Sequence, residues 1–283
     1  MAGRAVREGL VPPKAATIVP GGPRHIPAGE SIPPTVHGVS VSIPDLASLI
    51  GFESKDPATL QRIPRGYPRF RLHPYVARVV ELMARRRRLS PDQLVPTRSV
   101  TAARTAALYA GLGHDAVVQD RGVAAVAAGR GSPALPRVRD FVQHTGSHLS
   151  SRQAEDVLLA EGMLDEPQAE TTRPDRPDRA VAEAVAEAYG LPDATGVSIH
   201  NSGMNALYAT ITALDDLQRP RGRRRWLQLG WIFFDTVKLF EKRIVDAEHE
   251  VVPNPLDVDQ LARLVDERAA GLAGIIAEVP SNR

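Results

Sequence analysis

The chain has 283 residues, 43% of them hydrophobic and 24% charged, a composition that is typical of a globular protein and excludes wholesale disorder. Cysteine is absent, which excludes disulfides, thiol nucleophiles and cysteine-ligated zinc. Lys+Arg number 35 and Asp+Glu 33, so the formal charge of +2 gives no reason to expect a nucleic-acid partner. No apolar run reaches the roughly 18 residues of a membrane helix, and no signal-peptide core follows Met1. We therefore expect no membrane partner and a cytoplasmic location.

The first 80 residues combine an extended arm with short helices. Residues 1–35 are rich in proline and glycine and show no hydrophobic period, which predicts an arm. A turn at residues 42–45 predicts a short helix after it, and residues 65–70 form a loop with two arginines and two aromatics. The apolar spacing of residues 74–87 predicts an amphipathic helix. The face that this helix should bury carries Val76, Val79, Val80 and Met83.

The middle of the chain predicts short elements followed by a linker. Helices or strands are expected at residues 101–109, 116–119, 123–127, 135–141 and 151–161. Charged residues and prolines at 165–178 predict a solvated linker.

After residue 178, helical and strand patterns alternate. Helices are expected at residues 179–189, 202–217, 235–243 and 257–270, and strands at 196–201, 226–229, 248–252 and 274–279. This alternation predicts parallel βαβ units in a layered α/β domain.

Two basic runs and one histidine pair allow other functions. The runs, residues 85–88 and 219–225, lack interleaved aromatics for base stacking, and we interpret them as helix-end and solvated loop charge. His144 and His148 have the spacing of two zinc ligands on one helical face. Gly146 interrupts that face and no acidic third ligand is suitably spaced, so we predict satisfied or exposed histidines and no metal site.

The strongest candidate site begins at Ser202, Gly203 and Met204, where a strand-like run meets a helix. A helix N-terminus offers free N–H groups and positive partial charge, and glycine lets a phosphate approach the backbone. Read without other motifs, the same residues are an ordinary N-cap followed by a turn glycine.

Three further motifs suggest a ligand for this helix end. Tyr67 and Arg69 lie in a proline-fixed loop and are both suited to phosphate. Phe233 follows a strand at the position where α/β sheets open their ligand crevice. Asn282 follows the last predicted strand. Together these residues describe a site for a flat phosphorylated ring.

These motifs resemble those of the pyridoxal-phosphate enzymes of Cys/Met metabolism, the cystathionine γ-synthase and γ-lyase group, and in particular a bacterial subgroup of it. The resemblance implies that Ser202, Gly203 and Met204 bind the cofactor phosphate and that Phe233 stacks on the pyridine ring. It likewise implies that Asn282 hydrogen-bonds the cofactor. Tyr67 and Arg69 would reach the phosphate of a neighbouring subunit, so the resemblance implies a homodimer or homotetramer that takes a small amino-acid substrate.

The resemblance also implies a fold class. We expect an α/β protein of fold type I, with an aspartate aminotransferase-like large domain, a mixed and mostly parallel sheet, flanking helices and a helical insertion. The expected domains are an N-terminal arm with the cofactor-phosphate loop (1–80), an inserted mainly helical region with its linker (81–178) and the start of the cofactor-binding large domain (179–283).

The chain departs from the family pattern in three ways. About 135 residues separate Arg69 from Gly203, far more than is typical, and Phe233 replaces the usual tyrosine. Arg283 stands where the family has a proline, and the aspartate and Schiff-base lysine expected further on have no counterpart. The basic residues include only four lysines, none suitably placed for that role: Lys14, Lys55, Lys238 and Lys242.

The expected function is therefore that of an N-terminal portion of a trans-sulfuration enzyme. Such an enzyme performs cystathionine γ-synthase-like replacement or elimination on sulfur amino acids. We expect a truncated large domain, no catalytic residue within the chain and no activity for the chain alone. The alternative is a non-catalytic interaction or regulatory protein that retains part of the fold.

Overall fold

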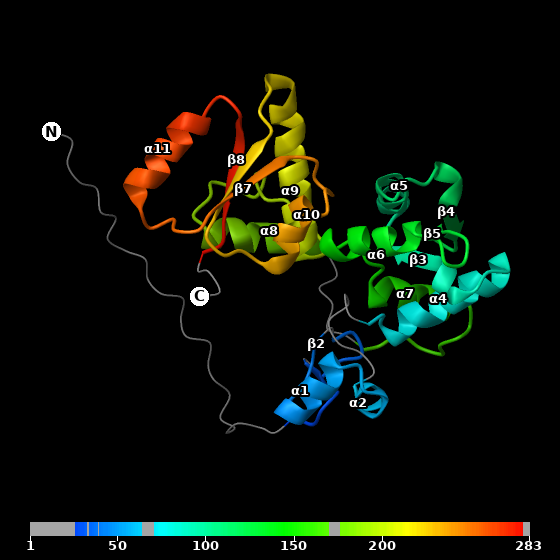
Figure 1. Cartoon of the computed structure of the whole chain (residues 1–283). Coiled ribbons are helices and arrows are strands. Elements are labelled where there is room, and N and C mark those ends of the chain that lie inside the picture. Colours follow the sequence, from blue (N-terminus) through cyan, green and yellow to red (C-terminus); the bar gives the residue numbers. More distant parts are fainter. Residues whose placement is uncertain (1–25, 33, 39, 64–70, 170–175, 280–283) are drawn as a thin grey trace. The chain divides into compact units, whose positions relative to one another are not determined.

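A computed structural model of the chain describes residues 26–32, 34–38, 40–63, 71–169 and 176–279 (Figure 1). Its contacts divide the chain into two units, Met1–Gly66 and Tyr67–Arg283. The predicted arm lies almost wholly outside the described residues. Within them, no helix combines the length and the apolarity of a membrane span.

The described part of the first unit contains two short strands and two short helices. Strands β1 (Ser31–Ile32) and β2 (Ser40–Val41) pair in antiparallel fashion. Helices α1 (Leu46–Glu53) and α2 (Pro57–Arg62) follow. The carboxylate of Asp45 accepts a hydrogen bond from the Ser48 backbone N–H at 2.7 Å, and this N-cap fixes the start of α1 at the position that the sequence predicts.

Residues 74–164 form an α/β region around a three-stranded antiparallel sheet, which we call the antiparallel-sheet region. The strand order is β3 (Leu94–Thr97), β5 (Val123–Ala127) and β4 (Val117–Asp120). Four helices pack on this sheet: α4 (Pro74–Arg87), α5 (Val100–Tyr109), α6 (Ala134–His144) and α7 (Ser151–Ala160). As predicted, α4 buries Val76, Val79, Val80 and Met83.

The central strand β5 explains why this region has two cores. Val123 and Ala125 belong to the core with α4 and α7, whereas Ala124 and Val126 belong to the core with α5 and α6. Successive side chains of a strand point to opposite faces, so an uninterrupted apolar strand lies between two helical layers. The predicted inserted region therefore combines its helices with a sheet. Helix α4 crosses the predicted boundary at residue 81 and lies in the same core as α7.

Residues 177–279 form the parallel-sheet region. The central strand β6 (Arg225–Leu229) pairs in parallel with β7 (Glu248–Val252) and β8 (Leu272–Ala277). Helices α10 (Phe234–Glu241) and α11 (Val258–Arg268) make the two crossovers, and α8 (Pro177–Ala188) and α9 (Gly203–Gln218) precede the sheet. The predicted alternation of parallel βαβ units is confirmed. The core joins α9, α10 and the sheet through Ile211, Trp226, Leu239, Phe240 and Ala273.

One prediction in this region needs correction. Residues 196–201 form no strand, because no strand among the described residues pairs with them; Ile199 is 43% exposed.

Three of the five arginines in the 219–225 run form ion pairs with nearby carboxylates: Arg219 with Asp215, Arg224 with Asp246, and Arg225 with Glu248. Local carboxylates therefore neutralise part of the charge of this run.

The two-core packing can be tested with a pair of leucines from the antiparallel-sheet region. Leu158 of α7 is fully buried, whereas Leu108 of α5 is 57% exposed. We expect Leu158→Ala to lower the free energy of unfolding by about 2–5 kcal/mol, because it leaves a cavity. We expect Leu108→Ala to change it by less than about 0.5 kcal/mol. Urea unfolding followed by circular dichroism measures both, and equal losses would contradict the packing described.

Candidate functional site

The N-terminus of α9 is an open anion-binding feature. Ser202 is the N-cap, with an extended backbone, and its Oγ accepts a hydrogen bond from the Asn205 N–H at 3.2 Å. Within the described part of the chain, the N–H groups of Gly203 and Met204 donate to no acceptor. Gly203 is exposed, and the space next to its Cα is empty. Two donors at the positive end of a 16-residue helix are thus available to an anion.

The predicted aromatic motif lies beside this helix end. Phe233 is the N-cap of α10, and its carbonyl accepts from the Thr236 N–H at 2.9 Å. Thr236 is buried, with its Oγ1 3.9 Å from the Met204 sulfur. The structure therefore brings the Ser202–Met204 loop and the Phe233–Thr236 segment together, although 29 residues separate Met204 from Phe233 in sequence.

The other predicted site residues, Tyr67, Arg69 and Asn282, lie outside the described residues. The carboxyl end of β8 leads toward Asn282 and is aligned with that of β6, since Leu229 pairs with Ala277. Glu278, which follows β8, has a carboxylate oxygen, Oε2, that is buried and has no hydrogen-bond partner among the described residues. A buried carboxylate oxygen thus lies just after β8, at the edge where α/β sheets place their ligands.

A buried pair that the sequence analysis missed connects the two regions. The Nδ1 atom of His144, at the end of α6, lies 2.9 Å from Oδ1 of Asp235, in the first turn of α10. Their side chains are only 3% and 2% exposed. His144 is thus satisfied by a carboxylate from a distant part of the chain. The described residues contain no group of three or more His, Cys, Asp and Glu side chains that could hold a metal ion.

The turn after His144 contacts residues on both sides of the Ser202–Met204 loop. The Asn205 side-chain amide donates to the Thr145 carbonyl at 3.2 Å, and the Asn201 amide donates to the Gly146 carbonyl at 3.3 Å. Arg98, in the loop after β3, donates from Nη1 to the Asn201 amide oxygen at 3.0 Å. The antiparallel-sheet region therefore contacts the candidate site next to the start of α9. No short-range pattern reveals these contacts, because they join residues 55 to 103 positions apart.

His148 lies near the same pair. Desolvation lowers the pKa of His148 from its ordinary value of 6.5 to about 4; the Asp235 charge opposes this shift and the His144 charge adds to it. His148 is thus neutral in the folded chain at pH 7.

Lys238 of α10 and Lys242, the C-cap residue of this helix, have acidic partners. Lys238 pairs with Glu241, and the Lys242 Nζ lies 2.8 Å from an Asp140 carboxylate oxygen. Neighbouring carboxylates therefore hold both side chains in place.

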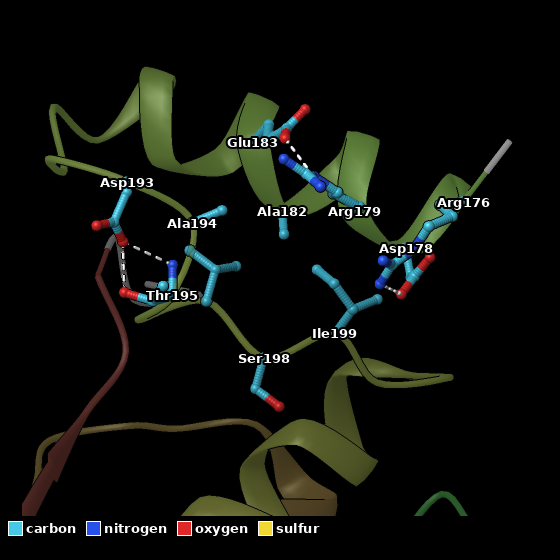
Figure 2. A pocket seen from close by; sticks show the side chains of 11 residues that line it. Arg176, Asp178, Arg179, Ala182, Glu183, Asp193, Ala194, Thr195, Ser198 and Ile199 are labelled. Atoms are coloured by element: carbon cyan, nitrogen blue, oxygen red, sulfur yellow. Dashed lines mark hydrogen bonds and ion pairs between the residues drawn. The ribbon is translucent and has the colours of Figure 1, made fainter.

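Away from the start of α9, a hollow of about 620 Å³ lies between α8 and residues 193–199 (Figure 2). Ala182 and Ile199 point toward one another across it. Its arginines are already paired, Arg176 with Asp178 at 3.8 Å and Arg179 with Glu183 at 2.7 Å. This hollow therefore offers less to a charged ligand than the start of α9 does.

The buried pair predicts a large difference between two aspartates. We expect Asp235→Ala to lower the free energy of unfolding by about 3 kcal/mol or more, because it leaves His144 buried without a partner. Asp246→Ala also removes an ion pair, but its carboxylate is 66% exposed, and we expect a loss below about 1 kcal/mol. Urea denaturation at pH 7 measures both, and similar losses would show that the His144 pair is not a buried constraint.

His148 predicts a pH dependence. Its folded pKa is below its unfolded pKa, so the unfolded chain binds more protons between pH 6.5 and 4, and stability falls as the pH falls through this window. A pKa unit corresponds to about 1.4 kcal/mol, so His148→Gln should reduce this fall by up to about 3 kcal/mol. The exposed His114→Gln serves as the control. Denaturation curves at several pH values measure the difference, and parallel profiles for the His148 variant and the unaltered chain would refute it.

Two curated proteins are similar in sequence to this chain. The chain is 56% identical over 251 residues, 89% of its length, to an L-2-amino-4-chloropent-4-enoate dechlorinase/desaturase of Streptantibioticus cattleyicolor. It is 37% identical over 57 residues, 20% of its length, to a cystathionine γ-synthase of Saccharomyces cerevisiae. No family model and no solved structure matches.

The matched parts cover 50% of the dechlorinase/desaturase and 9% of the cystathionine γ-synthase, so the chain spans about half the length of the first relative. These similarities confirm the predicted resemblance to the cystathionine γ-synthase-like family of pyridoxal-phosphate enzymes of Cys/Met metabolism.

Proposed function

We propose that this chain supplies the cofactor-phosphate and ring-contact parts of a pyridoxal-phosphate enzyme that acts at the γ-carbon of an α-amino acid. The names of both relatives support this reaction class. In 2-amino-4-chloropent-4-enoate the chlorine is on carbon 4, which is the γ-carbon, and the other relative is a γ-synthase. The identity to the dechlorinase/desaturase supports a substrate with a halide at that carbon more strongly than the sulfur amino acid that the motifs first suggested.

The observation that carries this proposal is the pair of free N–H groups at Gly203 and Met204. A phosphate needs several donors and no nearby carboxylate, and the first turn of α9 contains no acidic residue. The empty space next to Gly203 admits a ligand up to the backbone. The site therefore fits a phosphate monoester.

The neighbouring residues fit the remainder of the cofactor. Phe233 provides an apolar ring at the start of α10, and Thr236, three residues further on, contacts Met204. Asn282 is proposed to donate to the ring oxygen, and Tyr67 and Arg69 to reach the phosphate of a second subunit in a homodimer or homotetramer. When bound, pyridoxal phosphate supplies an electron sink for cleavage of bonds in the amino acid. The described residues hold and orient that group, and Ser202 keeps the donors in place by capping α9.

The parallel sheet supports fold type I for residues 177–279. In open parallel sheets, ligands bind outside the carboxyl ends of the strands. Both β6 and β8 end at this edge, and the segment after β6 leads directly to Phe233 and α10.

One glycine position tests the phosphate site. Gly203→Pro removes a free N–H while keeping the helix start, because proline is favoured at the first helical position and the extended Ser202 is compatible with a following proline. Gly203→Ala keeps the N–H and meets no other atom. A hydrogen bond to a charged group contributes about 1.5–3 kcal/mol, so we expect Gly203→Pro to weaken binding of pyridoxal phosphate about 10- to 100-fold.

Isothermal titration calorimetry with pyridoxal phosphate, and separately with inorganic phosphate, measures these affinities. Gly203→Ala should bind both within about twofold of the unaltered chain. Circular dichroism verifies that α9 is retained in each variant. Equal affinities for the proline and alanine variants, or no binding by the unaltered chain, would contradict the proposed function.

A further inference from the structure

The turn at residues 144–147 contacts both elements of the proposed cofactor site. We call these four residues the 144–147 turn. His144 contacts the first turn of α10 through Asp235, and Thr145 contacts the first turn of α9 through Asn205. The turn therefore joins the helix that would hold the phosphate to the helix that begins at Phe233.

The approach of the turn to α9 depends on a glycine. Gly146 has a φ of +63°, a conformation that side chains disfavour. A Cβ atom at Gly146 would lie 2.3 Å from Ser202 Oγ and 3.0 Å from the Asn205 backbone nitrogen. The first distance is far below van der Waals contact and the second is tighter than most contacts, so glycine lets the turn lie this close to the N-cap.

The contact with α10 is equally constrained. His144 and Asp235 are both almost completely buried, and neither side chain can move away without leaving a buried polar group unsatisfied. Asp235 is adjacent to Thr236 and two residues after Phe233, so its position fixes the first turn of α10. By contrast, the hydrogen bond that links α9 to α10 directly, Thr236 to Met204 at 3.9 Å, is a weak one to sulfur.

We propose that the 144–147 turn is a positioning element of the cofactor site, with Gly146 and His144 as positioning residues that act through Ser202 and Asp235. This inference rests on the proposed function and deepens it. The antiparallel-sheet region then belongs to the binding site, because it fixes the position of the N–H groups of Gly203 and Met204 relative to the Phe233 ring.

Two glycines with the same backbone conformation provide a matched test. Gly162 has a φ of +64° but nothing within 4 Å of its missing Cβ, so Gly162→Ala carries the backbone cost without the collision. Small displacements of a positioned group cost up to about 100-fold. We therefore expect Gly146→Ala to weaken binding of pyridoxal phosphate and of inorganic phosphate at least about tenfold relative to Gly162→Ala. Calorimetry measures the affinities, and thermal melts verify that both variants fold.

Hydrogen exchange tests the turn without any ligand. Exchange of the backbone amides of residues 203–206 should be faster in Gly146→Ala than in the unaltered chain, and unchanged in Gly162→Ala. If the unaltered chain binds no phosphate but this difference is observed, the proposed function fails and the positioning role stands. Unchanged exchange in Gly146→Ala overturns the positioning role. Tighter phosphate binding by Gly146→Ala also overturns it, because the turn would then obstruct the site.

A second pair of variants keeps the test independent of Gly146. His144→Gln retains a side-chain hydrogen-bond donor for Asp235, whereas His144→Leu keeps a side chain of similar size but has no donor. We expect faster exchange at the amides of residues 234–237 and weaker cofactor binding in His144→Leu, with both largely restored in His144→Gln. Equal behaviour of the two variants would show that His144 fills space and positions nothing.

Discussion

The buried pair between His144 and Asp235 is the constraint on which the candidate site depends. Both groups are removed from water, so each requires the other, and the backbone that carries them has little freedom. The pair joins a helix of the antiparallel-sheet region to the first turn of α10 in the parallel-sheet region. The Ser202–Met204 loop lies next to this junction, so its geometry depends on residues from both regions.

The parallel sheet is the part of the fold that the sequence predicts best. Strands at residues 225–229 and 248–252 are short, rich in apolar or β-branched residues and separated by a helical segment, and these local patterns specify βαβ units. The N-cap at Ser202 is equally local, because Ser202 and Asn205 are three residues apart. By contrast, the run at 196–201 has the composition of a strand but no neighbouring strand, and composition cannot supply one.

The antiparallel sheet shows why the type of the elements in the middle of the chain could not be predicted. The strand at residues 123–127 contains three alanines, which occur in helices and strands alike, and it is buried on both faces, so it lacks the alternation that identifies a strand. The partner of His144 could not be predicted for a related reason. His144 is satisfied, as one of the two predicted alternatives, but by Asp235, which is 91 residues away, and no local spacing points to it. Local spacing specifies helix caps and crossovers, but it does not specify which distant buried polar side chains pair with one another.

This contact pattern changes the meaning of the long separation between Arg69 and Gly203. An insertion that only decorated the fold would contact the site through exposed side chains. Here the backbone of Gly146 lies against the N-cap of α9, at a distance that no residue with a Cβ permits. A buried histidine from the same turn reaches the start of α10. The residues between Arg69 and Gly203 therefore support the Ser202–Met204 loop from within the core. Removing them would expose Asp235 and release the first turns of α9 and α10.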